Sequence, residues 1–221
     1  MLISIIFEGR EDNYTINCVS VEPPKCNANI DVGFIIDSSG SLRSEYHKEK
    51  DFVKALATSF GISPGGSRAG VVTFSARAEH SIKMSDHTDV HSFSHAVDAI
   101  PLMGFTTRID RALRLTQKEL FAPKNGGRLN VPKLLILLTD GTQTKAPHAE
   151  DPGDITEELR QAGISTIIIG IGTGIDETEL NHMAGGEHGG DGKAYFASSF
   201  DELAGGKFIT KLVKKSCKEG E

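Results

Sequence analysis

The segment Asp37-Ser38-Ser39-Gly40-Ser41 carries one carboxylate and two hydroxyl groups at alternating positions. In a tight loop, this spacing lets the side chains of Asp37, Ser39 and Ser41 converge. Gly40 permits the backbone angles that such a loop needs. Oxygen ligands of this kind suit hard divalent cations, and Mg²⁺ takes six of them at nearly octahedral geometry. The segment therefore predicts part of a divalent cation site, which other segments must complete.

Two apolar runs are expected to position these groups. Residues 30–36 are apolar at nearly every position, which is typical of a strand buried on both faces, and residues 133–138 form a second such run that ends at Asp140. Ligands bind at the carboxyl ends of parallel strands, so Asp37 and Asp140 would meet there. Close carboxylates repel one another unless a cation neutralises them. We therefore favour a metal site over the alternative that the hydroxyl groups only cap the turn and the following helix.

Apolar periodicity predicts that strands alternate with helices along the chain. The expected strands span residues 30–36, 68–75, 78–83, 133–138, 165–171 and 194–196. The expected helices span residues 44–60, 90–100 with Thr88 as a cap, 107–120, 155–162, 177–183 and 200–215. The pattern indicates an α/β fold with a doubly wound, mostly parallel central sheet, one short antiparallel edge strand and helices on both faces. We expect a leader or linker over residues 1–25, one domain over 26–217 and a tail over 218–221.

Composition and charge exclude several classes of protein. The formal net charge is −6 and no long Lys/Arg block is present, which argues against a nucleic-acid surface. No apolar run approaches the roughly 18 residues that span a bilayer, so we expect no membrane insertion. Residues 1–7 are apolar but lack a basic leading segment, so we do not interpret them as a signal peptide.

The three cysteines, Cys18, Cys26 and Cys217, include no Cys-x-x-Cys pair, which argues against a zinc cluster. Cys26 precedes the first expected strand and Cys217 follows the last expected helix, so a disulfide between them would join the two ends of the domain; isolated thiols are the alternative. Closing so long a loop would stabilise the fold by about 5 kcal/mol on chain-entropy grounds. With the glycosylation sequon Asn13-Tyr14-Thr15, this pairing favours an extracellular setting and hence a secreted protein.

Three segments in this order make the sequence similar to the von Willebrand factor type A domain. They are Asp37-x-Ser39-x-Ser41, the segment from Gly104 to Leu113, and Leu138-Thr139-Asp140-Gly141. The resemblance extends from about Asn27 to Cys217. It implies an extracellular adhesion or matrix module, similar to those of matrilins, collagen VI and integrin α subunits, that has a metal-ion-dependent adhesion site and no catalytic activity.

The resemblance also implies roles for individual residues. Asp37, Ser39 and Ser41 would contact Mg²⁺ or Mn²⁺, Thr107 would contact it directly or through water, and Asp140 would act through water. Ca²⁺ stays open as the ion, and Thr106 competes with Thr107 as the ligand. A carboxylate of the bound partner protein would fill the last coordination position.

Side chains around the metal site would form a rim that selects the partner. The expected rim consists of Leu42, Arg43, Tyr46, Phe105, Thr106, Gln143, Thr144, Lys145 and His148. Phe105 stands where a small residue is frequent in the family, and Ile109 where a second threonine is common. The expected partner is an extracellular matrix or cell-surface protein, and both a collagen-like chain and a second copy of this chain stay open. The alternative function is a structural component of an extracellular or mineralised matrix that assembles by self-association.

Other chemistry-bearing patterns are weaker. A phosphatase of the haloacid dehalogenase type needs a second carboxylate two residues after its aspartate, where this chain has Ser39. Gly170-x-Gly172-x-Gly174 lacks the last glycine of the dinucleotide-binding pattern, since Ile175 fills that place. His87, His91 and His95 recur every fourth residue and suggest a transition-metal site, but we expect them on the exposed face of a helix. The sequence therefore predicts that the protein is not an enzyme.

Overall fold

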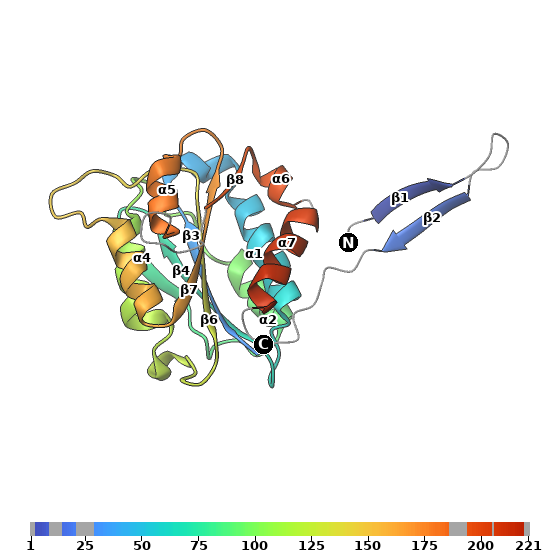
Figure 1. Cartoon of the computed structure of the whole chain (residues 1–221), viewed down its shortest axis with the longest axis horizontal. Helices are drawn as coiled ribbons and strands as arrows, with labels where there is room; N and C mark the ends of the chain where they lie inside the picture. Colours follow the sequence, from blue (N-terminus) through green and yellow to red (C-terminus); the bar gives the residue numbers. More distant parts are fainter. Residues whose placement is uncertain (1–2, 9–14, 21–28, 186–193, 205, 219–221) are drawn as a thin grey trace.

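In a computed structural model of the chain, six strands form one sheet in the order β5-β4-β3-β6-β7-β8 (Figure 1). The structure describes residues 3–8, 15–20, 29–185, 194–204 and 206–218. The strands of this sheet are β3 (Asp31–Asp37), β4 (Arg68–Phe74), β5 (Ala78–Ile82), β6 (Lys133–Thr139), β7 (Ile164–Ile171) and β8 (Tyr195–Ala197). Neighbouring strands run parallel except β4 and β5, which are antiparallel. The predicted α/β fold, with one antiparallel edge strand, is confirmed.

Helices cover both faces of the sheet (Figure 1). They are α1 (Tyr46–Phe60), α2 (Val90–Asp98), α3 (Ile109–Leu115), α4 (Pro152–Gln161), α5 (Glu177–Met183), α6 (Phe200–Ala204) and α7 (Gly206–Lys218). Successive β3 side chains point to opposite faces of the sheet. Phe34 packs with α1 and α2, and its ring centroid lies 6.2 Å from that of Phe93, whereas Ile35 packs with α3 and α4. Burial on both faces explains why this strand is apolar at nearly every position.

The helix predicted over residues 107–120 is only partly α-helical. After α3 the chain continues as a π-helical segment, η2 (Thr116–Leu120), whose wider turn directs Leu120 onto the sheet. It packs over Gly33 and Gly70, which are paired in β3 and β4. A Cβ atom at Gly33 would lie 2.5 Å from Leu120 Cδ2 and 2.8 Å from Phe121 Cζ, so these two glycines leave the space that the apolar side chains fill.

Two helices are capped by aspartates that the sequence analysis did not identify. The prediction of Thr88 as a cap is wrong, because the Asp89 carboxylate accepts hydrogen bonds from the N–H groups of His91 and Ser92 at 3.0 and 2.9 Å. Helix α4 begins three residues earlier than predicted, because Asp151 caps it by accepting a hydrogen bond from Gly153 N at 2.8 Å.

The closing stretch predicted to be helical over residues 200–215 is described as two helices, α6 and α7, one on each side of residue 205.

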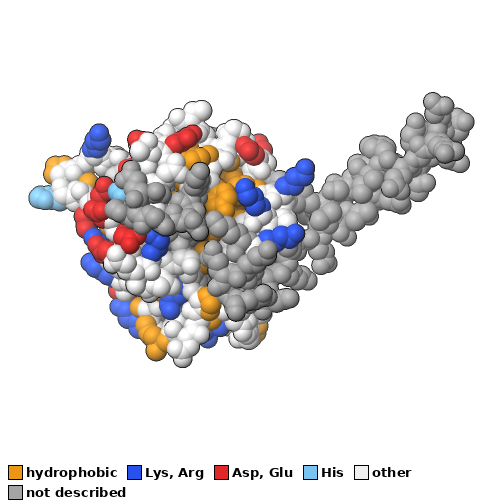
Figure 2. Space-filling view, viewed as in Figure 1, with side chains coloured by type: hydrophobic (Ala, Val, Ile, Leu, Met, Phe, Trp, Pro, Cys, Tyr) orange, Lys and Arg blue, Asp and Glu red, His pale blue; other side chains and the backbone are white. Residues whose placement is uncertain are grey.

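Two further short 3₁₀-helices, η1 (Gly40–Ser44) and η3 (Pro123–Asn125), lie in loops. Strands β1 (Ile3–Glu8) and β2 (Thr15–Ser20) form a separate antiparallel pair within the stretch predicted as a leader or linker. Charged side chains of both signs are spread over the face drawn in Figure 2. Within the described residues, no helix is both long and apolar enough to cross a membrane.

Candidate functional site

Three loops meet at the carboxyl edge of the sheet. The loop after β3 and the loop before α3 exchange backbone hydrogen bonds: Gly40 N donates to Phe105 O at 3.1 Å, and Gly104 N donates to Ser38 O at 2.8 Å. The Ser41 hydroxyl donates to Asp140 Oδ1 at 2.8 Å, which joins the loop after β6 to the same cluster. The parallel topology therefore brings together segments that lie far apart in the sequence.

Hydrogen bonds connect four of the five predicted metal ligands in one cluster. Asp37 is fully buried; its Oδ1 accepts a hydrogen bond from Ser39 N at 2.9 Å, and its Oδ2 accepts one from the Thr139 hydroxyl at 2.7 Å. The Ser39 and Ser41 hydroxyl oxygens lie 3.0 Å apart, and Ser41 extends the cluster to Asp140. Oxygen atoms of the kinds that hard cations prefer are thus held side by side.

Thr107, the fifth predicted ligand, lies against the turn that follows β6. A Cβ atom at Gly141 would lie 3.5 Å from Thr107 Oγ1. The backbone of this threonine is fixed by Thr144, because Thr107 N donates to Thr144 Oγ1 at 3.1 Å and Thr144 N donates to Thr107 O at 2.8 Å. Thr106, the competing candidate, is exposed. This arrangement favours Thr107 as the site threonine.

The two carboxyl groups of the cluster are less acidic than usual. Burial raises the pKa of Asp37 to about 6, although hydrogen bonds from Thr139 and Ser39 oppose the shift and the charge of Asp140 adds to it. Burial also raises the pKa of Asp140. Among the described residues, the groups that act on these two pKa values include no Lys or Arg side chain. The donor atoms and their electrostatics therefore fit a divalent cation, which would favour both ionised carboxylates.

Glu49 is a further part of the site that the sequence analysis missed. It lies on α1, is fully buried, and its Oε1 accepts a hydrogen bond from Asp37 N at 3.0 Å. Burial raises its pKa well above the usual range, and Oε2 has no hydrogen-bond partner among the described residues. A signal was available in the sequence, because Glu49 precedes Phe52 and Val53 on the apolar face of the predicted helix.

Asp110 was also missed, and it fastens α3 to the loop after β6. Arg108 donates two hydrogen bonds to its carboxylate, at 2.8 and 2.6 Å, and both side chains are almost fully buried. Gln143 Nε2 donates to Asp110 Oδ1 at 2.8 Å, and Glu150 N donates to Oδ2 at 3.3 Å. Burial alone would raise the pKa of Asp110, but the bonds from Arg108, Gln143 and Glu150 lower it.

The predicted rim divides into buried and exposed members. Leu42 and Tyr46 are only 2% and 5% exposed and pack in the core, unlike the expectation, because the turn of η1 directs them beneath the loop. Phe105 is 79% exposed with a φ of +70°, in the left-handed region that bulky residues avoid. The other members are exposed or partly exposed: Arg43, Thr106, Gln143, Thr144, Lys145 and His148.

Two remaining sequence predictions concern cysteines and histidines. The Cys26–Cys217 disulfide lies outside what the structure describes, since Cys26 and the side chain of Cys217 are not included. His91 and His95 are exposed, and His87 packs edge-on against Phe93 with ring centroids 6.5 Å apart. In the described part of the chain, no three His, Cys, Asp or Glu side chains gather as a metal-binding group.

Comparison with known proteins gives consistent matches. The family description "von Willebrand factor type A domain" matches residues 31–210. The collagen alpha-4(VI) chain of Mus musculus is 30% identical over 204 residues, which cover 91% of this chain and 8% of that protein. Matrilin-1 of Gallus gallus is 29% identical over 158 residues, which cover 70% of this chain and 31% of that protein. The chain thus spans a minor part of the length of these relatives.

A solved structure has the same fold. It is proximal thread matrix protein 1 from the mussel byssus, described as having a zinc-occupied MIDAS motif; it is 29% identical with a TM-score of 0.76, and the match covers 87% of this chain and 47% of that chain. Collagen VI, matrilin-1 and the byssus protein are matrix proteins, and the prediction that the chain is not an enzyme is confirmed by its family. The sequence match over residues 31–210 and the shared fold show that the chain belongs to the von Willebrand factor type A domain family.

Proposed function

We propose that this chain is an extracellular adhesion or matrix module that binds a protein partner through a divalent cation. The observation that carries the proposal is the hydrogen-bonded cluster of Asp37, Ser39, Ser41 and Asp140 at the carboxyl edge of the sheet. Burial raises the pKa of both of its carboxyl groups, and a bound cation would offset the cost of ionising them.

Each residue of the candidate site would have a separate role in binding the cation. Asp37 supplies a carboxylate whose orientation is fixed by Thr139 and by Ser39 N. Ser39, Ser41 and Thr107 supply uncharged oxygen atoms, and Asp140 acts at the outer side through Ser41 or a water molecule. With so few anionic ligands, the bound cation supplies an electrophilic position that accepts a carboxylate oxygen of the partner.

The donor set bears on which ion is bound. Hydroxyl and carboxylate oxygens suit Mg²⁺ and Mn²⁺, whereas zinc prefers nitrogen and sulfur ligands. We therefore propose Mg²⁺ or Mn²⁺ as the resident ion, with Ca²⁺ as a weaker candidate. The zinc of the byssus protein supports a metal at the equivalent motif without fixing its identity here.

The relatives support the proposed setting. Because collagen VI chains and matrilin-1 are matrix proteins, we propose that this chain is secreted and that its partner is an extracellular matrix or cell-surface protein. A collagen-like chain and a second copy of this chain are the two partners to test first. Exposed Phe105 would contact the partner beside the ion.

A second candidate function is a structural matrix component that assembles by self-association, with the cation acting mainly within the domain. The similarity to a byssus thread matrix protein favours this candidate. The two functions differ in whether chelation releases the partner.

Calorimetric titration of Mg²⁺ and Mn²⁺ tests the metal site directly. We expect one site on the wild-type chain and at least a tenfold loss of affinity in Asp37→Asn, which keeps the size of the side chain and an oxygen for Ser39 N. Ser44→Ala is the matched control, because Ser44 is exposed just beyond the loop, and its affinity should be unchanged. Absence of Mg²⁺ and Mn²⁺ uptake by the folded wild-type chain would overturn the proposal.

Capture from a matrix extract then tests the function. We expect the wild-type chain to retain partner proteins in Mg²⁺, and to lose them in EDTA or after Asp37→Asn. Capture that survives EDTA and the substitution would contradict a cation-dependent contact. Sedimentation of the purified chain at rising concentration, with and without EDTA, distinguishes the second candidate, which requires self-association that EDTA does not reverse.

A further inference from the structure

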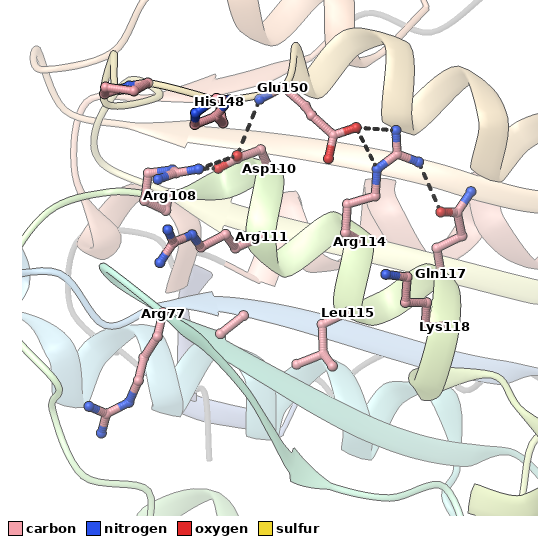
Figure 3. Close-up of a pocket in the computed structure, with 12 residues that line it drawn as sticks. Arg77, Arg108, Asp110, Arg111, Arg114, Leu115, Gln117, Lys118, His148 and Glu150 are labelled. Carbon is pink, nitrogen blue, oxygen red and sulfur yellow. Dashed lines mark hydrogen bonds and ion pairs between the residues drawn. The ribbon is translucent and has the colours of Figure 1, made fainter.

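A groove lined by none of the predicted metal ligands opens between α3, the start of β5 and the segment before α4 (Figure 3). Its volume is about 780 Å³. Five Lys and Arg side chains line it against two carboxylates, although the formal net charge of the chain is −6. The five are Arg77, Arg108, Arg111, Arg114 and Lys118. Positive charge is therefore concentrated at this groove.

Two of the five cations already form ion pairs with carboxylates that line or flank the groove. Arg108 is buried and donates to both carboxylate oxygens of Asp110. Arg114 donates to the carboxylates of Glu150 and Glu158, as the dashed lines to Glu150 in Figure 3 indicate. The bonds of Arg114 link α3 to α4 and to the segment before it, which are two sides of the groove.

The other three cations are available to a ligand. Arg111 and Lys118 are exposed, and neither forms an ion pair with any residue in the described part of the chain. Arg111 Nη1 donates to the carbonyl oxygen of Ala76, which orients the guanidinium without neutralising it. Arg77 pairs with Glu79, but these side chains are 72% and 48% exposed, so the pair exchanges easily with another anion.

Two of the available cations, Arg111 and Lys118, lie seven residues apart on the continuous segment that α3 and η2 form. Arg114 lies between them in the sequence and is the cation already paired with Glu150 and Glu158. Leu115, on the same segment, is an apolar lining residue of the groove (Figure 3). Ala78 of β5 is a second apolar lining residue. A row of cations over an apolar floor fits an extended chain that alternates anionic groups with C–H surface, and it fits a single small anion poorly.

We propose that this groove binds a sulfated polysaccharide, independently of the metal site. Arg and Lys bind sulfate and carboxylate groups through charge-assisted hydrogen bonds, and the Arg fork binds them in a bidentate manner. An acidic peptide fits less well, because Glu150 and Glu158 repel any anion at Arg114 and a peptide carries at most one carboxylate per residue to offset that repulsion at the other cations. A sulfated polysaccharide carries a higher density of negative charge along an extended backbone, which the cations at Arg77, Arg111 and Lys118 can follow.

The test measures binding of a fluorescent heparin-derived octasaccharide to the whole chain by anisotropy, at low salt and in the presence of EDTA. Arg111→Ala/Lys118→Ala should weaken binding at least tenfold and lower the slope of log affinity against log salt by about two, one for each contact removed. The control, Lys83→Ala/Lys207→Ala, removes the same charge from two exposed lysines outside the groove lining and should change affinity less than twofold. Thermal unfolding of each variant verifies that the fold is intact.

Competing probes identify the source of the anionic groups. We expect the desulfated octasaccharide, an octaglutamate peptide and inorganic sulfate each to bind at least tenfold more weakly than the sulfated octasaccharide. Octaglutamate that binds as tightly as the sulfated octasaccharide would assign the groove to an acidic peptide. An equal loss of octasaccharide affinity in the groove variant and in the control variant would show that only the net charge of the chain matters. Each result overturns the proposal. So does absence of octasaccharide binding, or binding that EDTA abolishes. Because binding is measured in EDTA, failure of the metal site leaves this outcome unchanged.

Discussion

At the scale of single residues, Phe105 combines an exposed ring with a costly backbone conformation. Its φ is +70° and its side chain is 79% exposed, so the fold gains little from burying the ring. The left-handed region costs a non-glycine residue about 1–2 kcal/mol. The hydrogen bond that its carbonyl accepts from Gly40 holds the conformation in place. Strain of this kind persists where function uses it, which supports a contact between Phe105 and the partner.

Substitutions at Phe105 distinguish the cost of its left-handed backbone from its contact with the partner. Phe105→Gly should raise the free energy of unfolding by about 0.5–1 kcal/mol, because relief of the left-handed strain exceeds the flexibility that glycine adds to the unfolded chain. Phe105→Ala keeps the strain and should give no such gain. Both variants should weaken partner capture about tenfold, as truncation of an aromatic anchor does. Urea unfolding and the capture assay measure the two effects, and equal stability of the two variants would contradict the strain argument.

Asp37 gives the metal-free domain a defined dependence on pH. Its pKa in the folded state is about 6, above the unfolded value of roughly 3.9. Its contribution to stability is therefore fully present below pH 4 and is lost as pH rises through 6, which amounts to about 3 kcal/mol. In EDTA, Asp37→Asn should accordingly be more stable than wild type by up to about 3 kcal/mol at pH 7.5, and the difference should shrink towards pH 4. Urea unfolding across this range tests the expectation, and a pH-independent difference would contradict it.

At the scale of elements, the Asp110 carboxylate, paired with Arg108, joins the start of α3 to the loop after β6. Both side chains are buried, and Gln143 and Glu150 complete the hydrogen bonding of the carboxylate. The same loop carries Asp140 and most of the exposed rim. The position of the candidate site therefore depends on a contact that lies outside it.

Removing the charge of Asp110 tests this dependence. Asp110→Asn should lower the free energy of unfolding by about 3 kcal/mol, because it leaves Arg108 buried without a counter-charge. Hydrogen exchange should accelerate over residues 143–150. The lowered pKa of Asp110 means that its contribution is present above the unfolded pKa and is lost as pH falls through the folded value, so the variant and the wild type should converge in acid. Glu79→Gln is the control; it breaks the exposed pair with Arg77 and should cost less than about 1 kcal/mol.

At the scale of the whole molecule, the proposed Cys26–Cys217 disulfide would join the two ends of the domain. A tether of this kind would hold the closing helix α7 near the start of the domain. We therefore expect a domain that is constitutively competent to bind.

The proposed disulfide should increase the free energy of unfolding by an amount that can be measured. Under oxidising conditions, Cys26→Ser should lower the free energy of unfolding by up to about 5 kcal/mol, because the unfolded chain regains the entropy of a long loop. In reducing buffer the variant and the wild type should be equally stable. Cys18→Ser is the matched control and should have no effect in either buffer. Peptide mapping without reduction identifies the pairing directly, and a Cys18 linkage would refute it.

The sequence alone predicted the layers of this protein and most of its site. The runs that became β3 and β6 are apolar throughout because both of their faces are buried, and each delivers an aspartate to the same edge of the sheet. Parallel topology then suffices to predict that Asp37 and Asp140 lie close together, as the contact of Ser41 with Asp140 bears out.

Only the tertiary structure decided how the site is supported. Apolar periodicity reports which face of a helix is buried, but it does not reveal which polar atom a buried Glu49 or Asp110 will meet. The π-helical turn of η2 depends on the space that paired glycines leave in two strands, and the backbone of Phe105 depends on a hydrogen bond from a distant loop. Such features arise when segments far apart in the chain pack together, so no local pattern in the sequence encodes them.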